Sequence, residues 1–190
     1  MHPVPGMRSV NCIPCCMDEC EQFVLHKDYP NGGKIWLMLG LDTSGLDYND
    51  LICIAECFAE KGHEVKVLHA VHYKDPIYRE VFGELIGTRY YRKCPDLMVD
   101  GDLFEYESYV RPWNKRKLSN MLTNGLRQSD KIIIDNREGT GVRQIKRAIQ
   151  SRLYVNATIT EVWMYDGNNV VEVYIKNTGV PEGPLQGGAP

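Results

Sequence analysis

The strongest constraint on the fold is a short hairpin signal at Asp100-Gly101. Two β-prone runs, 96–99 and 103–109, flank this dipeptide. Asp-Gly favours a two-residue turn in which both residues adopt positive φ, and such a turn makes the flanking strands antiparallel neighbours. The chain is therefore expected to build a sheet around this pair of strands.

Helix and strand patterns alternate on both sides of the hairpin. Apolar residues at helical spacing predict helices over 47–61, 77–87, 113–128 and 140–152. Further strands are predicted over 35–41, 65–69, 131–135, 161–165 and 170–175. Ile132-Ile133-Ile134 is apolar on both faces, which is typical of a strand buried between two layers. The predicted fold class is α/β (α+β), a mixed sheet flanked by helices.

The length of 190 residues predicts one main domain, which we place at 35–177. Residues 1–34, which end in a Pro30-Asn31-Gly32-Gly33 turn, are expected to form an arm or small zinc module, and 178–190 a flexible Gly/Pro tail. No run is apolar enough for a membrane span, and the first thirty residues lack the apolar core of a secretion signal. We therefore expect a cytoplasmic protein with no membrane partner.

Charge is distributed unevenly along the chain. Residues 1–110 carry 10 Lys/Arg against 18 Asp/Glu, whereas 111–152 carry 11 against 3, a surplus of +8. This basic segment is either a solvated face or a surface for phosphates. The residues predicted to bind nucleic acid are Arg111, Lys115, Arg116, Lys117, Arg143, Lys146 and Arg147.

Four of the seven cysteines, Cys12, Cys15, Cys16 and Cys20, crowd into the N-terminal arm. In a cytosolic chain such a cluster favours a Zn²⁺ site over disulfides. There is no second Cys pair at zinc-finger distance, so free reduced thiols are the alternative.

Three acidic residues in and before the hairpin are the candidate catalytic and metal-binding residues: Asp96, Glu105 and Glu107. Glu105 and Glu107 are two residues apart, so on a strand their side chains face the same side. They either face solvent on a half-buried strand or gather with Asp96 in a cleft, where they could bind one Mg²⁺ or Mn²⁺ ion.

The expected order helix, strand, strand, strand, helix, strand, followed by helix, strand, strand, resembles the restriction-endonuclease-like PD-(D/E)XK nuclease superfamily. Pro95-Asp96 on one strand and Glu105-Tyr106-Glu107 on the next carry the resemblance. It implies a divalent cation that polarises the scissile phosphate and lowers the pKa of a bound water.

A longer stretch, roughly 30–177, is similar to the C-terminal tRNase domains of contact-dependent growth-inhibition toxins, which have relatives in phage and mobile-element proteins. The motifs are Pro30-Asn31-Gly32-Gly33-Lys34, Cys94-Pro95-Asp96-Leu97, Asp100-Gly101, Glu105-Tyr106-Glu107 and the run 126–135. The resemblance implies a metal-dependent RNase acting on tRNA or other RNA, with Asp96 and Glu105 as ion ligands. It further implies a protein inhibitor as a partner and the cytoplasm of a bacterial or phage-infected cell as the compartment.

One position departs from the superfamily pattern. The lysine expected two residues after the second acid, which orients the attacking water and stabilises developing charge, is Glu107 here. Glu107 could instead be another metal ligand, Lys115 or Arg111 could supply the cation, or the site could be inactive. Glu56, on the first long helix, is a candidate for a further catalytic acid, or an ordinary solvated residue.

Two other functions stay open. The chain could be a catalytically inert nucleic-acid-binding or adaptor module of a phage or mobile element. It could also be a metal-independent RNase that uses His, Glu and Arg and works with all ions chelated.

Overall fold

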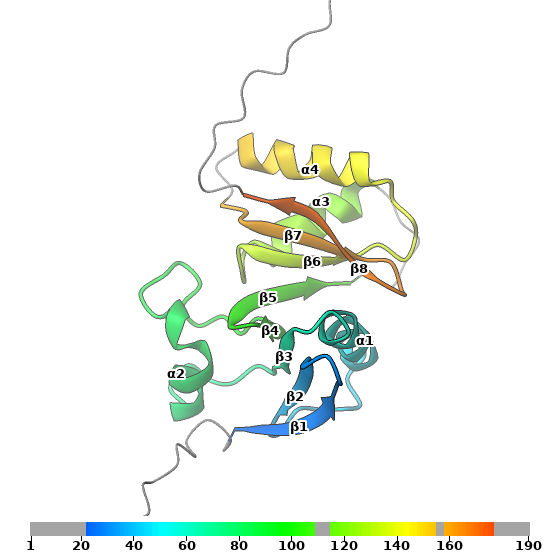
Figure 1. Ribbon diagram of the computed structural model, residues 1–190. Coiled ribbons are helices and arrows are strands. Elements are labelled where there is room, and N and C mark those ends of the chain that lie inside the picture. Colours follow the sequence, from blue (N-terminus) through cyan, green and yellow to red (C-terminus); the bar gives the residue numbers. More distant parts are fainter. Residues whose placement is uncertain (1–21, 109–114, 155–157, 177–190) are drawn as a thin grey trace, which may run out of the picture.

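We describe the chain from a computed structural model that covers residues 22–108, 115–154 and 158–176. Its strands are β1 Phe23–Asp28, β2 Lys34–Met38, β3 Glu64–Val67, β4 Leu97–Val99, β5 Asp102–Glu107, β6 Lys131–Asp135, β7 Glu161–Tyr165 and β8 Val170–Ile175. Its helices are α1 Tyr48–Ala59, α2 Pro76–Phe82, α3 Lys115–Gly125 and α4 Val142–Tyr154, and the 3-10 turn Gly83–Leu85 follows α2 (Figure 1). None of the helices in these ranges has the length and apolarity needed to cross a bilayer.

The eight strands pair in chain order in one mixed sheet. Strands β2, β3, β5, β6 and β7 run in one direction, whereas β1, β4 and β8 run against it. The carboxyl ends of the five co-directional strands therefore lie at the same edge of the sheet. In open α/β sheets this is the edge at which ligands bind.

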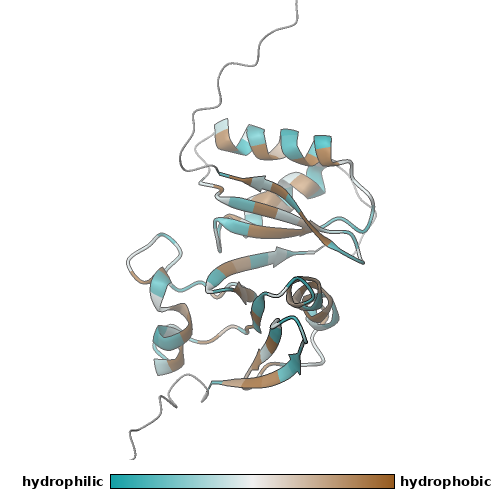
Figure 2. Cartoon of the chain, viewed as in Figure 1, coloured by the Kyte–Doolittle hydropathy of each residue, from teal (hydrophilic) through white to brown (hydrophobic). Residues whose placement is uncertain are grey.

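Side-chain alternation along the strands separates the two faces of the sheet. Phe104 and Ile133 pack with α1 on one face. Their neighbours point the other way, because successive strand residues alternate: Ile132 packs with α3 and α4, and Leu103 packs with α2. The apolar side of α4 correspondingly faces the sheet in Figure 2. The predicted mixed α/β class is thereby confirmed, with helices on both faces.

The Asp100-Gly101 turn forms as the sequence predicts. Asp100 has φ 49° and Gly101 has φ 93°, and Val99 pairs with Asp102 across the turn. The strands on either side are antiparallel neighbours, so Asp96 and the two glutamates of β5 are brought to the same part of the sheet.

In chain order, α2 and its 3-10 turn lie between β3 and β4. From α1 the chain runs through β3, β4, β5, α3 and β6, and then through α4, β7 and β8. Expected and observed boundaries differ by a few residues. The expected helix 77–87 is α2 followed by the 3-10 turn, and the expected helix 113–128 is described as α3, Lys115–Gly125.

The sheet begins earlier than the boundary expected at residue 35. Strand β1 lies within the expected arm and pairs with β2 through the turn at Tyr29–Gly33. The sequence signal for β1 is weak because most of its side chains are exposed, and a bulge between Leu25 and Lys27 breaks the alternation. The four arm cysteines and the tail 178–190 lie outside the described residues.

Candidate active site

Carboxylates from three elements meet at the edge where the co-directional strands end. Asp47 follows β2 and is the N-cap of α1, Asp96 directly precedes β4, and Glu107 ends β5. Asp47 accepts a hydrogen bond from Ser108 Oγ at 2.9 Å, which ties the start of α1 to the end of β5. The topology therefore gathers residues that are 60 positions apart in the chain.

Asp96 and Glu105 lie across from each other on neighbouring strands. Leu97 pairs with Phe104, and continuing this antiparallel register by one residue sets Asp96 opposite Glu105. Asp96 Oδ2 accepts the backbone N–H of Tyr106 at 3.0 Å, which fixes the aspartate against β5. Since Leu97 and Phe104 face α1, Asp96 and Glu105 face the α2 and α3 side.

Glu105 is the most unusual member of this group. Its side chain is buried, with 4% of the residue exposed, and one oxygen accepts a hydrogen bond from the Gln128 amide. The other oxygen, Oε2, is buried without a partner in the described chain. Burial, together with the charges of Asp96 and Glu107, raises the pKa of Glu105 to about 10. A buried polar atom without a partner is rare in native proteins and points to an absent ligand or a functional role.

The neighbouring acids respond to the same crowding. Burial raises the pKa of Asp96 to about 6. The hydrogen bond from the Tyr106 N–H lowers this pKa, and the negative charge of Asp47 raises it further. Burial and the charges of Asp96 and Asp47 raise the pKa of Glu107 to about 7. Like charges close together disfavour ionisation, so these four carboxyl groups form one electrostatic cluster, which we call the carboxylate cluster.

The donor chemistry of the carboxylate cluster suits a hard divalent cation such as Mg²⁺ or Mn²⁺, which prefers carboxylate oxygens. Within the described ranges, however, no three His, Cys, Asp or Glu side chains stand close enough to hold one ion. A shared ion would therefore require the cluster's side chains to rotate toward each other. Glu105 Oε2 makes no hydrogen bond in the described chain, so binding an ion would break none there.

Lys93, which was not among the residues predicted from the sequence, affects the electrostatics of this cluster. The positive charge of Lys93 lowers the pKa of Glu105, against the larger effects of burial and neighbouring acids. Lys93 lies three residues before Asp96, on the loop that enters β4. The expected substitutes are not placed: Arg111 and the side chain of Lys115 lie outside the described residues. Its position directly before the Cys94-Pro95-Asp96 motif is the sequence signal from which Lys93 could have been predicted.

The structure does not bring Glu56 to the carboxylate cluster. Glu56 Oε1 accepts from Lys27 Nζ at 2.6 Å and so joins α1 to β1. Nine residues separate it from Asp47, or about 13 Å along a helix. Asp47, rather than Glu56, is the acid that α1 contributes.

A second polar network, centred on Arg137, joins three elements of the fold. Both terminal nitrogens of Arg137 donate hydrogen bonds to the Asp50 carboxylate, at 2.9 and 2.8 Å. Arg137 Nε donates a hydrogen bond to Asp135 at 3.1 Å. Tyr106 Oη donates to Asp50 Oδ2 at 3.1 Å. These bonds join α1, β5 and the end of β6, and Asp50 and Asp135 are therefore already engaged.

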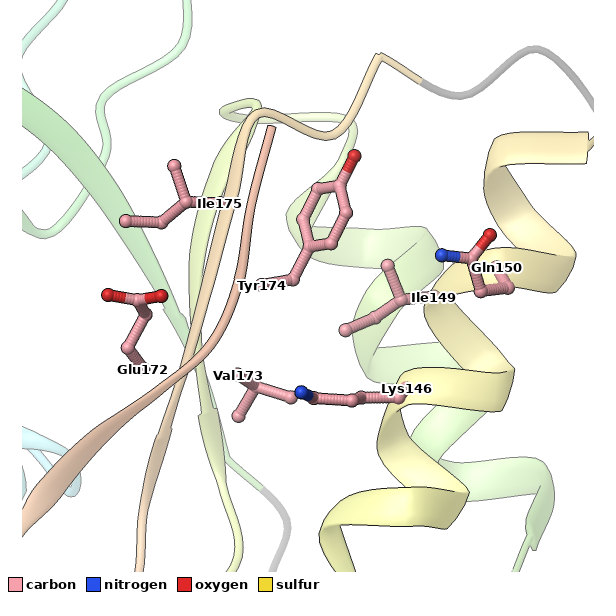
Figure 3. A pocket seen from close by; sticks show the side chains of 7 residues that line it. All are labelled: Lys146, Ile149, Gln150, Glu172, Val173, Tyr174 and Ile175. Carbon is pink, nitrogen blue, oxygen red and sulfur yellow. The ribbon is translucent and has the colours of Figure 1, made fainter. Parts of the chain in front are cut away.

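Five of the predicted nucleic-acid-binding residues have described side chains, and they lie on two adjacent helices. Arg116 and Lys117 lie on α3, and Arg143, Lys146 and Arg147 lie on α4, all three of these α4 residues being exposed. Figure 3 shows Lys146 reaching across a groove toward Val173 of β8, with Gln150 and Tyr174 on its walls. Helices α3 and α4 contact each other, so these cations share one side of the sheet.

His63, His69 and His72 do not share a common site in the described residues. His63 pairs with Asp100 at 2.6 Å, His69 Nε2 contacts the Leu39 carbonyl at 2.9 Å, and His72 Nδ1 accepts the Lys74 N–H at 3.3 Å. A metal-independent RNase built on grouped His, Glu and Arg side chains therefore gains no support from their arrangement.

Comparisons with protein-family models, with curated proteins and with solved structures found no match.

Proposed function

We propose that this chain is a metal-dependent nuclease that cleaves RNA, with tRNA as the expected substrate. The observation that carries the proposal is the buried, unpartnered Glu105 Oε2, opposite Asp96 on the neighbouring strand. Because a lone buried carboxylate oxygen is costly, a ligand that accepts electron pairs would explain why it is kept there.

Asp96, Glu105 and Glu107 would hold the ion, with Asp47 as a further oxygen donor. When bound, a divalent cation would polarise the scissile phosphate and lower the pKa of the attacking water. The superfamily's lysine is replaced by Glu107 in this chain. Lys93 would supply the positive charge in its place, next to the developing negative charge. Hydrolysis joins the water oxygen to phosphorus, breaks one P–O bond, and transfers a proton to the leaving oxygen.

The element order supports a restriction-endonuclease-like arrangement of this sheet. Helix α1, the β3–β4–β5 meander, α3 and a parallel β6 follow the order that the resemblance implies. On the same basis we propose a toxin-type domain that acts in the bacterial cytoplasm and is restrained by a protein inhibitor. Zn²⁺ at Cys12, Cys15, Cys16 and Cys20 is proposed separately, since those residues lie outside the described chain.

The deciding experiment is the cleavage of total tRNA and plasmid DNA with Mg²⁺, with Mn²⁺ and with a chelator. Wild type is expected to cleave RNA only with a divalent ion. Glu105→Gln keeps the shape but removes a ligand charge, so it should lower cleavage at least about 100-fold while binding stays within about twofold. Glu60→Gln, which changes an exposed acid directly after α1, is the matched control and should cleave like wild type.

A second function is favoured by one observation, the lack of three described side chains close enough to share a metal ion. The chain would then be an inert nucleic-acid-binding or adaptor module. Salt-dependent binding with no cleavage of RNA or DNA under any ion would establish this function and refute the nuclease. Cleavage in excess chelator would refute both and point to a metal-independent enzyme.

A further inference from the structure

A pocket of about 540 Å³ opens on the α2 side of the sheet, between the start of α2 and the loop that leads to β4. Three tyrosines, two cations and two acids line it, together with Pro76 and Ile86: Tyr73, Tyr78, Tyr91, Lys74, Arg79, Asp75 and Glu80. We call it the tyrosine pocket. Neither the proposed hydrolysis nor the packing of the core uses its exposed side chains.

The rings are held edge to face. Tyr91 meets Tyr73 with ring centres 6.0 Å apart at 77° and meets Tyr78 at 6.2 Å and 75°. Tyr78 is buried at 1% exposure and forms the floor, whereas Tyr91 is 39% exposed. Such packing fixes the orientation of the Tyr91 ring while leaving part of it accessible to a ligand.

Arg92 places a positive charge on this aromatic group. Its guanidinium carbon lies 4.3 Å from the centre of the Tyr73 ring and 5.4 Å from that of Tyr91. Its backbone has φ 72°, which costs a non-glycine residue about 1–2 kcal/mol. The Tyr78 hydroxyl accepts the Arg92 N–H at 2.8 Å and supports this conformation. Strained residues of this kind concentrate at ligand-binding sites.

The same loop runs directly into the carboxylate cluster. Lys93 follows Arg92 and acts on Glu105, and four residues after Arg92 comes Asp96, at most about 14 Å away along the chain. Residues 86–95 contain three cations and no acid. Of the two acids on the pocket wall, Asp75 is occupied as the N-cap of α2, where it accepts from Ile77 N at 3.0 Å. The other is Glu80.

We propose that the tyrosine pocket binds an unpaired base of the nucleic-acid strand whose backbone passes the carboxylate cluster. This rests on the proposed nuclease function. Tyr91 stacks on the base, and Lys74, Arg79 and Arg92 face the flanking phosphates. Every base has a flat π face, so this mode of binding tolerates sequence variation, and a base inside a duplex cannot use it.

The test is equilibrium binding of the full chain to a short labelled RNA single strand, the matching DNA strand and an RNA duplex, all in excess chelator. Tyr91→Ala should weaken single-strand binding roughly 5- to 150-fold, the value of one lost stacking contact. Tyr91→Phe keeps the ring and should stay within about twofold. Tyr154→Ala, which removes a tyrosine that is 92% exposed on α4, is the control for losing an exposed ring.

A second variant tests the phosphate contacts. Lys74→Ala with Arg79→Ala should flatten the salt dependence of single-strand binding by about 0.7 units of log–log slope for each lost contact.

Wild-type affinity in Tyr91→Ala, or an equal loss on the duplex, would overturn the proposal. A similar loss on the RNA and DNA strands supports base stacking without a 2′-hydroxyl contact, and a larger loss on RNA supports stacking on RNA.

The two proposals can fail separately, because binding is measured without metal. If nothing is cleaved yet Tyr91→Ala still loses single-strand affinity, the nuclease is refuted and the pocket stands. If RNA is cleaved and Tyr91→Ala binds like wild type, only the pocket is refuted.

Discussion

At the scale of single residues, Glu105 shows a conflict between stability and binding. Its carboxyl group is buried opposite Asp96, and one of its oxygens has no partner in the described chain. An unligated fold therefore has to protonate this group or bear a buried charge. A hydrophobic residue at this position would pack without that cost, and the proposed ion site would explain why a carboxyl group stands here instead.

This conflict predicts how stability depends on pH in metal-free protein. Glu105 has a pKa of about 10 when folded, whereas a glutamate in an unfolded chain titrates near 4.3. Between these values the native state binds more protons than the unfolded state, so the free energy of unfolding falls as pH rises. Glu105→Gln removes this dependence, and its stability relative to wild type should grow by up to about 1.4 kcal/mol per pH unit.

The measurement is urea unfolding in chelator from pH 6 to pH 9. Glu172→Gln, exposed on β8, controls for the loss of a negative charge and should run parallel to wild type. Parallel curves for Glu105→Gln and wild type would show that Glu105 is not protonated in the fold.

Residue-level prediction reached only part of the carboxylate cluster. Asp96, Glu105 and Glu107 could be found because the Asp-Gly turn makes their strands neighbours and a two-residue spacing fixes the face. Asp47 and Lys93 could not, because their approach depends on how α1 and the 86–95 loop pack at the sheet edge. Glu56 looked suitable on its helix, but its partner, Lys27, lies on a strand with little sequence signal.

At the scale of elements, the first hairpin is joined closely to the end of α1. The Asn31 amide donates to the carbonyls of Ala59 and Glu60 at 3.2 and 2.8 Å, which caps the helix C-terminus. Gly33 lies so near the helix that a Cβ would come within 1.9 Å of the Ala59 oxygen. The hairpin therefore belongs to the folded domain and positions α1, whose N-terminal end supplies Asp47.

Gly33→Ala should consequently destabilise the fold by at least about 2–3 kcal/mol, because backbone atoms on both sides would have to shift. Gly32→Ala is the matched control. Gly32 has φ 91° with nothing within 4 Å of the added Cβ, so it should lose only about 1–2 kcal/mol. Urea denaturation measures both losses, and equal values would show that the α1 contact is loose.

Elements with strong periodicity could be read from the sequence, and elements at the margin could not. The buried strand β6 and helices α1 and α4 follow from unbroken apolar patterns. Strand β1 is an edge strand whose side chains are mostly exposed, so burial left little pattern in its residues. Its bulge and its Lys27 are features that discourage pairing with a further strand.

At the scale of the whole molecule, charge and topology separate two tasks. The acids that are proposed to act on phosphate gather at the carboxyl edge of the central strands, whereas the +8 segment spans α3, β6 and α4. The proposed binding contacts and the proposed chemistry thus depend on different residues. A nucleic-acid strand bound along α3 would pass the edge that holds Glu107, since α3 packs against β5.

This separation predicts that binding can be weakened without altering the chemistry. Lys115→Ala with Arg116→Ala, at the start of α3, should weaken nucleic-acid binding and flatten its salt dependence by about 0.7–0.9 units of slope per lost phosphate contact. Cleavage at saturating substrate should stay close to wild type, the opposite of the Glu105→Gln result. Lys27→Ala with Lys34→Ala removes the same charge from the β1–β2 hairpin, far along the sheet, and should leave the slope unchanged. An equal flattening in both double variants would mean that net charge, rather than a surface on α3, governs binding.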